Sequence, residues 1–163
     1  MEFKHAYTVQ ATSTLPRSGV IRAGGIDTPI AFSAPPEFNG RVGLWTPEHF
    51  FVASVASCYV STFSSIAEIS KFEFISLDLE TEGFLGKDEK GLRFLGITLR
   101  PQVKIAREAD RDRALRLLEK AEKGCLIARS IFCPVTMEPE IHVEGELVEV
   151  GSGGYSLGMI LVK

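Results

Sequence analysis

The stretch that decides the fold covers residues 46–60 and reads TPEHFFVASVASCYV. Thr46 fits the N-cap of a helix, Pro47 fits its first position, and Glu48 complements the positive end of the helix dipole. The residues that follow are apolar or small on every face, which is typical of a helix buried in a protein core or between two subunits. The pattern predicts such a helix from Thr46 to about Ser70.

Segments with strand character flank this helix on both sides. The residues before it read as short strands separated by the turn signal Gly24-Gly25. The residues after it alternate between apolar and polar side chains with a period of two, as half-buried strands do. The polar run from Gly83 to Gly91 reads as the turn between two of the later strands. The predicted strands are residues 6–12, 20–23, 29–32, 75–82, 94–105 and 137–144.

A second helix is predicted from Glu108 to Lys123, with Gly124 as its C-terminal stop. One stripe of this helix is apolar and its other faces are charged, so it covers a core on one side only. The order β-β-β-α-β-β-α-β predicts an α+β fold of antiparallel sheets around a long buried central helix. We expect one domain over residues 1–163, in which residues 145–163 form a C-terminal extension. The apolar stripe consists of Ala114, Leu117, Leu118 and Ala121.

The composition limits the classes of partner. The chain has 163 residues, of which 45% are apolar and 24% charged, with a formal net charge of −3. We therefore expect neither a nucleic-acid partner nor an anionic membrane surface. The N-terminus lacks the apolar core of a signal peptide, and no segment reaches the roughly 20 apolar residues that span a bilayer. We expect a cytoplasmic protein without a membrane partner, and three cysteines are too few for a structural disulfide framework.

Cys58 lies in the middle of the apolar helix, where a cysteine is most often inert packing. Reactivity requires a thiolate, and apolar surroundings raise the pKa of a thiol. A reactive Cys58 therefore needs a cation that folding brings to it. Arg17, in the loop after the first strand, is the first candidate for that cation, and Arg22 and Arg129 are its rivals.

Two further cysteines lie late in the chain. Cys125 follows the end of the second helix, where the helix dipole disfavours a thiolate, so it suits a resolving thiol better than a first nucleophile. Cys133 precedes Pro134 and reads as packing. The chain has no C-x-x-C motif, no His pair at ligand spacing, no G-x-S-x-G motif and no P-loop. We expect no metal and no cofactor.

Residues 46–58 resemble the OsmC/Ohr family of osmotically inducible and organic hydroperoxide resistance proteins. The resemblance is carried by the T-P-E element, the apolar run and a cysteine ten residues after Glu48. Upstream, residues 7–17 resemble the family's first strand and its loop arginine, and downstream Cys125 matches a second cysteine at the end of a helix. The resemblance covers roughly residues 5–145 and implies the OsmC-like fold in an intertwined homodimer.

The resemblance also implies a thiol peroxidase. By position, Cys58 is the peroxidatic thiol, which attacks an organic hydroperoxide and becomes a sulfenic acid, and Cys125 is the resolving thiol, which forms a disulfide with it. Arg17 is the cation that stabilises the thiolate, and Glu48 is the carboxylate that holds the arginine. In the family, an external dithiol, often a lipoyl group, reduces the disulfide. The alternative function on the same fold is a small-molecule or lipid-binding protein with little peroxidase activity.

Two features leave parts of this assignment open. The family's second cysteine is usually followed by proline, whereas Leu126 follows Cys125 and the dipeptide Cys133-Pro134 comes eight residues later, so Cys133 stays an alternative resolving thiol. Ten helical residues separate Glu48 from Cys58 by about 15 Å. One unbroken helix therefore cannot bring both side chains to the same arginine, which favours a site shared between two subunits.

Overall fold

The computed structural model describes residues 5–144 of the chain. The strands and long helices follow the predicted order, except that the last strand is divided in two and the second helix begins as a short 3-10 helix. The extension predicted at residues 145–163 lies outside the described residues. The elements are β1 (Val9–Leu15), β2 (Ser18–Ala23), β3 (Ile26–Ser33), η1 (Pro36–Phe38), α1 (Pro47–Ile69), β4 (Ser76–Asp88), β5 (Gly91–Ile105), η2 (Glu108–Asp110), α2 (Arg111–Gly124), η3 (Ala128–Ser130), β6 (Val135–Met137) and β7 (Glu140–Val143).

The chain divides after Phe51 into two compact units. The first unit contains β1, β2 and β3, which form one antiparallel sheet in that order. Gly25 has a φ of +78° in the β2–β3 hairpin, which confirms the predicted turn. The N–H of Ser33 donates to the carbonyl oxygen of Trp45 at 2.9 Å, so the segment that leads into α1 is held beside the end of β3.

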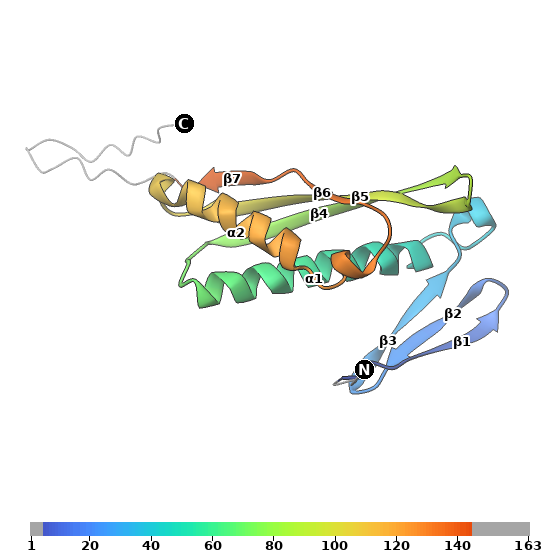
Figure 1. Ribbon diagram of the computed structural model, residues 1–163. Helices are drawn as coiled ribbons and strands as arrows, with labels where there is room; N and C mark the ends of the chain where they lie inside the picture. The colour runs from blue at the N-terminus through green and yellow to red at the C-terminus, as the bar shows by residue number, and fades with distance from the viewer. Residues whose placement is uncertain (1–4, 145–163) are drawn as a thin grey trace, which may run out of the picture. The chain divides into compact units, whose positions relative to one another are not determined.

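The second unit is built on a mixed sheet in which β5 is the central strand. β4 pairs antiparallel with β5, whereas β6 and β7 both pair parallel with it. The prediction of purely antiparallel sheets is therefore wrong for this unit. The reason is the connection, because α2 carries the chain across the sheet between β5 and β6 (Figure 1). Such a crossover makes the two strands that it joins parallel.

The turn predicted from Gly83 to Gly91 is also wrong. β4 and β5 pair along their whole length with one irregularity, and only Glu89 and Lys90 connect them. Gly83 serves packing instead, because a Cβ on this residue would lie 2.6 Å from Cγ2 of Val52. The missing side chain lets α1 approach the sheet at this point, so the glycine is a feature of the helix–sheet contact.

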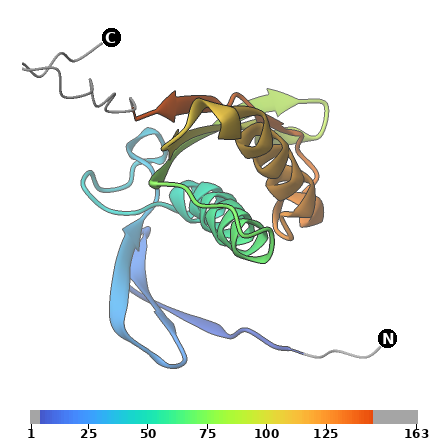
Figure 2. The ribbon, with the colours of Figure 1, turned by 90° about the vertical axis from the view of Figure 1, so that its left-hand side faces the viewer.

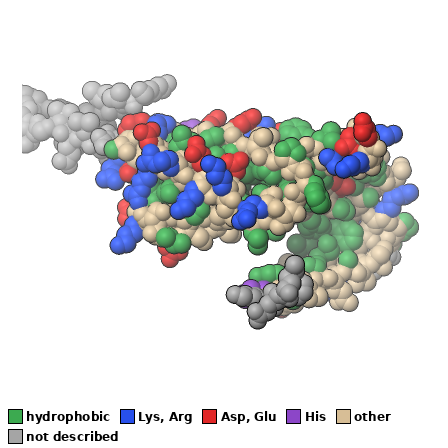
Figure 3. All heavy atoms as spheres, in the orientation of Figure 1, with side chains coloured by type: hydrophobic (Ala, Val, Ile, Leu, Met, Phe, Trp, Pro, Cys, Tyr) green, Lys and Arg blue, Asp and Glu red, His purple; other side chains and the backbone are tan. Residues whose placement is uncertain are grey.

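The core of the second unit lies between the sheet and the two helices, which lie on the same face of it (Figure 1, Figure 2). α1 buries one residue in every four, and the second half of β5 buries every second residue from Ile97 to Ile105. α2 is amphipathic as predicted, with mixed acidic and basic side chains on its outer side (Figure 3). The buried side chains are Val55, Tyr59, Phe63 and Ala67 on α1, Ile97, Leu99, Pro101, Val103 and Ile105 on β5, and Ala114, Leu117, Leu118 and Ala121 on α2.

α1 has more apolar surface than this core covers. Its most apolar 18-residue window has a mean hydropathy of 1.5, and 22% of that window is buried within the chain. By length and composition alone α1 could cross a bilayer, which corrects the prediction that no segment is long and apolar enough. This is weak evidence for a membrane span, because the core helix of a folded domain passes the same test. One face of α1 packs Val55, Tyr59 and Phe63 in the core of the second unit.

Candidate active site

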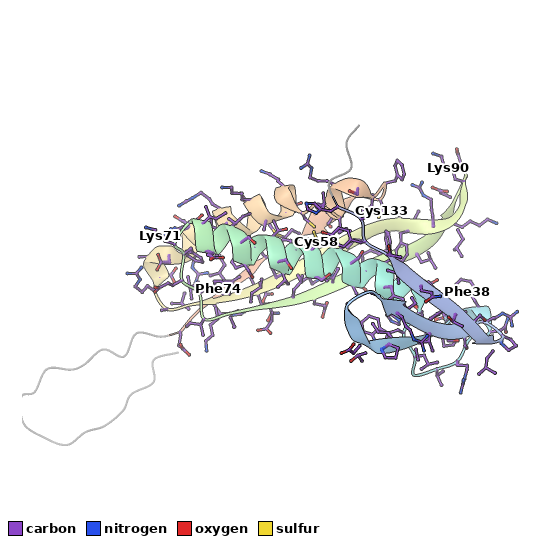
Figure 4. All side chains as sticks on the ribbon, turned by 90° about the horizontal axis from the view of Figure 1, so that it is seen from below. Phe38, Cys58, Lys71, Phe74, Lys90 and Cys133 are labelled. Atoms are coloured by element: carbon purple, nitrogen blue, oxygen red, sulfur yellow. The ribbon has the colours of Figure 1, made fainter. Side chains whose placement is uncertain are left out.

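Two thiols meet where the end of α2 reaches the middle of α1. Cys58 lies about halfway along α1 and is half-buried (Figure 4). Cys125, the C-cap residue of α2, is fully buried. The two thiols are hydrogen-bonded to each other, and Sγ of Cys125 also lies 4.0 Å from the carbonyl oxygen of Val55 on α1. The structure therefore places the predicted peroxidatic and resolving cysteines in contact.

The local sequence explains why the helices meet at this point. Gly124, the glycine predicted to stop the second helix, is the last residue of α2. A Cβ on Gly124 would lie 3.3 Å from Cγ2 of Thr62, which is one helical turn after Cys58 on α1. The glycine lets the end of α2 lie close against α1, and the next residue, Cys125, is thereby placed beside Cys58.

Backbone N–H groups of the segment after Cys125 point at both sulfurs. The N–H of Ile127 donates to Sγ of Cys58 at 3.5 Å, and the N–H of Leu126 is a further donor to the same sulfur. The N–H of Ala128 donates to the sulfur of Cys125. Hydrogen bonds to the charged form of a group favour that form, so this segment stabilises negative charge on the thiol pair.

These contacts give the two thiols different acidities. For Cys58, burial acts to raise the pKa, but hydrogen bonds from the Ile127 N–H, the Cys125 thiol and the Thr62 hydroxyl outweigh it, so the pKa lies below its ordinary value. For Cys125, burial raises the pKa, and the neighbouring Cys58 raises it further. The partly exposed Cys58 is therefore the thiol that ionises at the lower pH.

Arg17, the predicted cation, lies in the first unit, in the turn between β1 and β2. It has a left-handed backbone conformation with a φ of +57°. Its carbonyl oxygen accepts hydrogen bonds from the N–H of Ala34 at 2.8 Å and from the hydroxyl of Ser33 at 3.2 Å. Ser33 is fully buried, so the turn is fixed at its base. The side chain of Arg17 is exposed and forms no ion pair with any described residue.

Glu48 lies in the first turn of α1, where Thr46 acts as the predicted N-cap. Oγ1 of Thr46 accepts a hydrogen bond from the N–H of His49 at 3.3 Å. Oε2 of Glu48 is buried and accepts no hydrogen bond within residues 5–144. A buried carboxylate oxygen normally has a donor. The described chain does not join Glu48 to Arg17, so the predicted ion pair is not formed within it.

The alternative residues for the cation and for the resolving thiol lie in different parts of the chain. Arg22 lies on β2 in the first unit and is exposed. Arg129 lies on η3, where its backbone N–H donates to the carbonyl oxygen of Cys125 at 3.1 Å, while the residue is exposed and forms no ion pair within the part of the chain described. Cys133 is buried in the segment before β6 (Figure 4). Cys125, rather than Cys133, is the thiol that is hydrogen-bonded to Cys58.

The sequence interpretation missed the groups that hydrogen-bond to Cys58. The sequence predicts a cationic side chain beside Cys58, whereas the donors are the Thr62 hydroxyl and backbone N–H groups. Thr62 stands four residues after Cys58, a spacing that places both on one helix face, so its proximity could have been predicted. The N–H of Ile127 could not be predicted in this way, because no residue type marks a backbone N–H that points at a thiol. Among the described residues, no three His, Cys, Asp or Glu side chains are grouped as metal ligands.

Comparisons with known proteins extend these observations. The family described as OsmC-like protein matches residues 40–140. The Bacillus subtilis (strain 168) protein named Uncharacterized protein YmaD is 30% identical over 129 residues, which are 77% of this chain and 85% of that protein. An OsmC-like protein of unknown function from Vibrio cholerae has a TM-score of 0.74 at 24% identity, over 83% of this chain and 99% of its own. The organic hydroperoxide resistance protein OsmC from Legionella pneumophila has a TM-score of 0.70 at 22% identity, over 87% of this chain and 100% of its own.

The two structural neighbours confirm the predicted OsmC-like fold. The family match contains both the helix with Cys58 and the segment with Cys125. The relative from Bacillus subtilis is similar over most of its own length as well as most of this chain. On this evidence the chain belongs to the OsmC-like protein family.

Proposed function

We propose that this chain is a cysteine peroxidase that reduces organic hydroperoxides to alcohols. The observation that carries the proposal is the hydrogen-bonded pair of Cys58 and Cys125, in which the half-exposed thiol has the lowered pKa and the buried thiol the raised pKa. An accessible thiolate beside a second thiol is suited to form a sulfenic acid and then a disulfide. The Legionella pneumophila neighbour carries the name organic hydroperoxide resistance protein, which accords with this activity.

The reaction begins when the Cys58 thiolate attacks the distal oxygen of the O–O bond. The sulfur is oxidised to a sulfenic acid, and the alkoxide leaves and takes up a proton to become the alcohol. The sulfur of Cys125 then attacks the sulfenic sulfur. The S–S bond forms, the S–O bond breaks, and the hydroxide leaves as water with the proton of the Cys125 thiol.

An external dithiol, such as a lipoyl group, then reduces the disulfide. We place its attack on the sulfur of Cys58, because Cys125 is fully buried and Cys58 is the half-exposed member of the pair. The Cys125 thiol is released first, and the second thiol of the reductant then frees Cys58 and closes a disulfide of its own. The cytoplasm, which keeps thiols reduced, suits this cycle.

We propose further that the working site is completed in a homodimer. Oε2 of Glu48 lacks a donor and the guanidinium of Arg17 lacks an ion-pair partner within the described residues. Most of the apolar window of α1 is also uncovered. A second copy of this chain packed on α1 would bury that surface and allow a guanidinium and Glu48 to pair. The arginine would then stabilise the charge that develops on the departing oxygen.

The test compares the consumption of cumene hydroperoxide with that of hydrogen peroxide, with dihydrolipoamide or thioredoxin as the reductant. We expect the wild type to turn over the organic hydroperoxide, Cys58→Ser to lose the activity, and Cys133→Ser to keep it. Cys133 is the matched control, since it is a buried cysteine that is not hydrogen-bonded to Cys58. No turnover with either reductant, together with an ordinary pKa for Cys58, would instead indicate a small-molecule or lipid-binding protein.

A further inference from the structure

The N–H group of Ile127 faces a sulfur rather than a carbonyl oxygen. α2 ends at Gly124, so this N–H lies beyond the helical hydrogen-bond ladder. Its acceptor is Sγ of Cys58, which lies 3.5 Å away and 69 residues earlier in the chain. A neutral thiol is a weak acceptor, whereas hydrogen bonds to an ionised group are strong. The contact therefore favours the ionised form of Cys58 over the neutral form.

The turn that carries this N–H is fixed by two backbone hydrogen bonds. The carbonyl oxygen of Ile127 accepts the N–H of Ser130 at 2.9 Å, and the carbonyl oxygen of Cys125 accepts the N–H of Arg129 at 3.1 Å. The donor is thus part of a closed turn and not of a side chain that must be ordered first. A donor held in place before charge develops stabilises that charge without reorganisation.

No cationic side chain of the second unit takes this role among the described residues. The side chains that act most strongly on the two thiols are the thiols themselves and the hydroxyl of Thr62, and none of them is positively charged. Arg129, on the turn itself, is exposed. Within this unit, the charge of a Cys58 thiolate is stabilised by hydrogen bonds from backbone N–H groups, a hydroxyl and a neighbouring thiol.

We propose that the backbone N–H of Ile127 is a catalytic group, which stabilises the thiolate form of Cys58 by donating a hydrogen bond to its sulfur. Its role in catalysis rests on the proposed peroxidase function, because the thiolate is the species that attacks the O–O bond. The acidity of Cys58 accords with this role, since the Ile127 N–H is the largest of the influences that lower its pKa.

The test removes the N–H and keeps the backbone angle. Ile127 has a φ of −67°, which matches the φ that proline fixes, so Ile127→Pro deletes the donor at a compatible position. Ile127→Ala is the matched control, because it removes the same side chain and keeps the N–H. The readout is the pKa of Cys58, taken from the pH dependence of iodoacetamide alkylation resolved peptide by peptide.

In Ile127→Pro we expect the pKa of Cys58 to rise by about one unit, which corresponds to an about tenfold loss of thiolate at neutral pH. In Ile127→Ala it should stay at the wild-type value. Equal values in the two variants would overturn the proposal. A pKa response without any consumption of hydroperoxide would refute the peroxidase function alone, and consumption of hydroperoxide without a pKa response would refute this role of Ile127 alone.

A second measurement needs no proline variant and covers the case in which Ile127→Pro does not fold. In the wild-type protein labelled with nitrogen-15, the amide resonance of Ile127 should shift with pH through the same pKa as the alkylation of Cys58. The shift should vanish in Cys58→Ser. An Ile127 amide that does not respond to the ionisation of Cys58 would overturn the proposal.

Discussion

The hydroxyl of Tyr59 donates a hydrogen bond to the carbonyl oxygen of Leu118 at 3.3 Å and thereby ties α1 to α2 one residue after Cys58. The same hydroxyl lies 3.2 Å from Sδ of Met137 on β6. Tyr59 is fully buried, and burial together with the negative charge of Glu122 raises its pKa. The side chain therefore acts as a neutral donor that holds both helices and the sheet together beside the thiol pair.

Tyr59→Phe should lower the free energy of unfolding by about 1 kcal/mol, because it removes a buried hydrogen bond and keeps the ring. Tyr7→Phe makes the same chemical change where the side chain is 93% exposed, and it should have no measurable effect. Urea unfolding of both variants and the wild type measures the difference. Coincident transitions for the three proteins would show that the Tyr59 bond does not contribute.

Gly83→Ala should destabilise the protein by about 1–3 kcal/mol, because the added methyl group would lie 2.6 Å from Cγ2 of Val52 and 2.8 Å from Cε1 of Phe94, so that the packing between α1 and the sheet must shift. Gly96→Ala is the control on the neighbouring strand, where the nearest atom to the added Cβ is 3.8 Å away. Thermal unfolding compares the two. A smaller effect of Gly83→Ala than of Gly96→Ala would contradict the close approach.

Arg113 on α2 caps the C-terminal end of α1, where it donates a hydrogen bond to the carbonyl oxygen of Ser70. Its guanidinium also lies over the ring of Phe72, 5.4 Å from the centroid. Arg113→Ala should therefore cost about 1–2 kcal/mol of stability. Arg116→Ala, at an exposed position of the same helix, should change stability by less than about 0.5 kcal/mol. Guanidinium chloride unfolding tests the pair, and equal losses would refute the capping role.

Cys125→Ser should trap the oxidised form of Cys58. With no thiol beside it, the sulfenic acid persists after one equivalent of cumene hydroperoxide and reacts with dimedone, a reagent specific for sulfenic acids. The wild type should give little of this adduct, because Cys125 lies beside Cys58 and consumes the sulfenic acid. Mass spectrometry counts the adduct. Failure of Cys125→Ser to accumulate more adduct than the wild type would remove Cys125 from the resolving role.

The two thiols should ionise in a fixed order as the pH rises. The lowered pKa of Cys58 predicts that its alkylation begins at a lower pH than that of an ordinary thiol, whereas the raised pKa of Cys125 predicts alkylation only at a higher pH. Because the pair is in contact, the first proton leaves from Cys58 and its charge delays the second. Alkylation rates of each cysteine between pH 5 and 11 measure the order, and earlier reaction of Cys125 would reverse the assignment.

The helix that organises the fold could be predicted closely from the sequence, and the hairpin after it could not. α1 runs from Pro47 to Ile69, within a residue of the prediction, because its start depends on local groups such as the Thr46 cap. The sequence predicts a turn at Gly83, because glycine favours turns. In the structure, glycine is required at this position because Val52 of α1 approaches it closely. That approach is a tertiary contact, which the residues around Gly83 do not encode.

Part of the candidate site could likewise be predicted from the sequence, and part could not. The two cysteines could be found from the sequence, since the resemblance depends on residue types and spacing. Their different acidities could not, because the lowered pKa of Cys58 depends on the direction of the Ile127 N–H, and every residue except proline carries an N–H. The ion pair predicted between Arg17 and Glu48 stays a prediction, since the described chain leaves Oε2 of Glu48 without a donor.

The most direct test of the account is the disulfide that forms when the wild-type protein reacts with one equivalent of cumene hydroperoxide. Proteolysis without reduction, followed by mass spectrometry, identifies the linked peptides. The account predicts a single bond between Cys58 and Cys125, formed in step with the loss of hydroperoxide. A bond from Cys58 to Cys133, or three thiols left unchanged by the hydroperoxide, would contradict it.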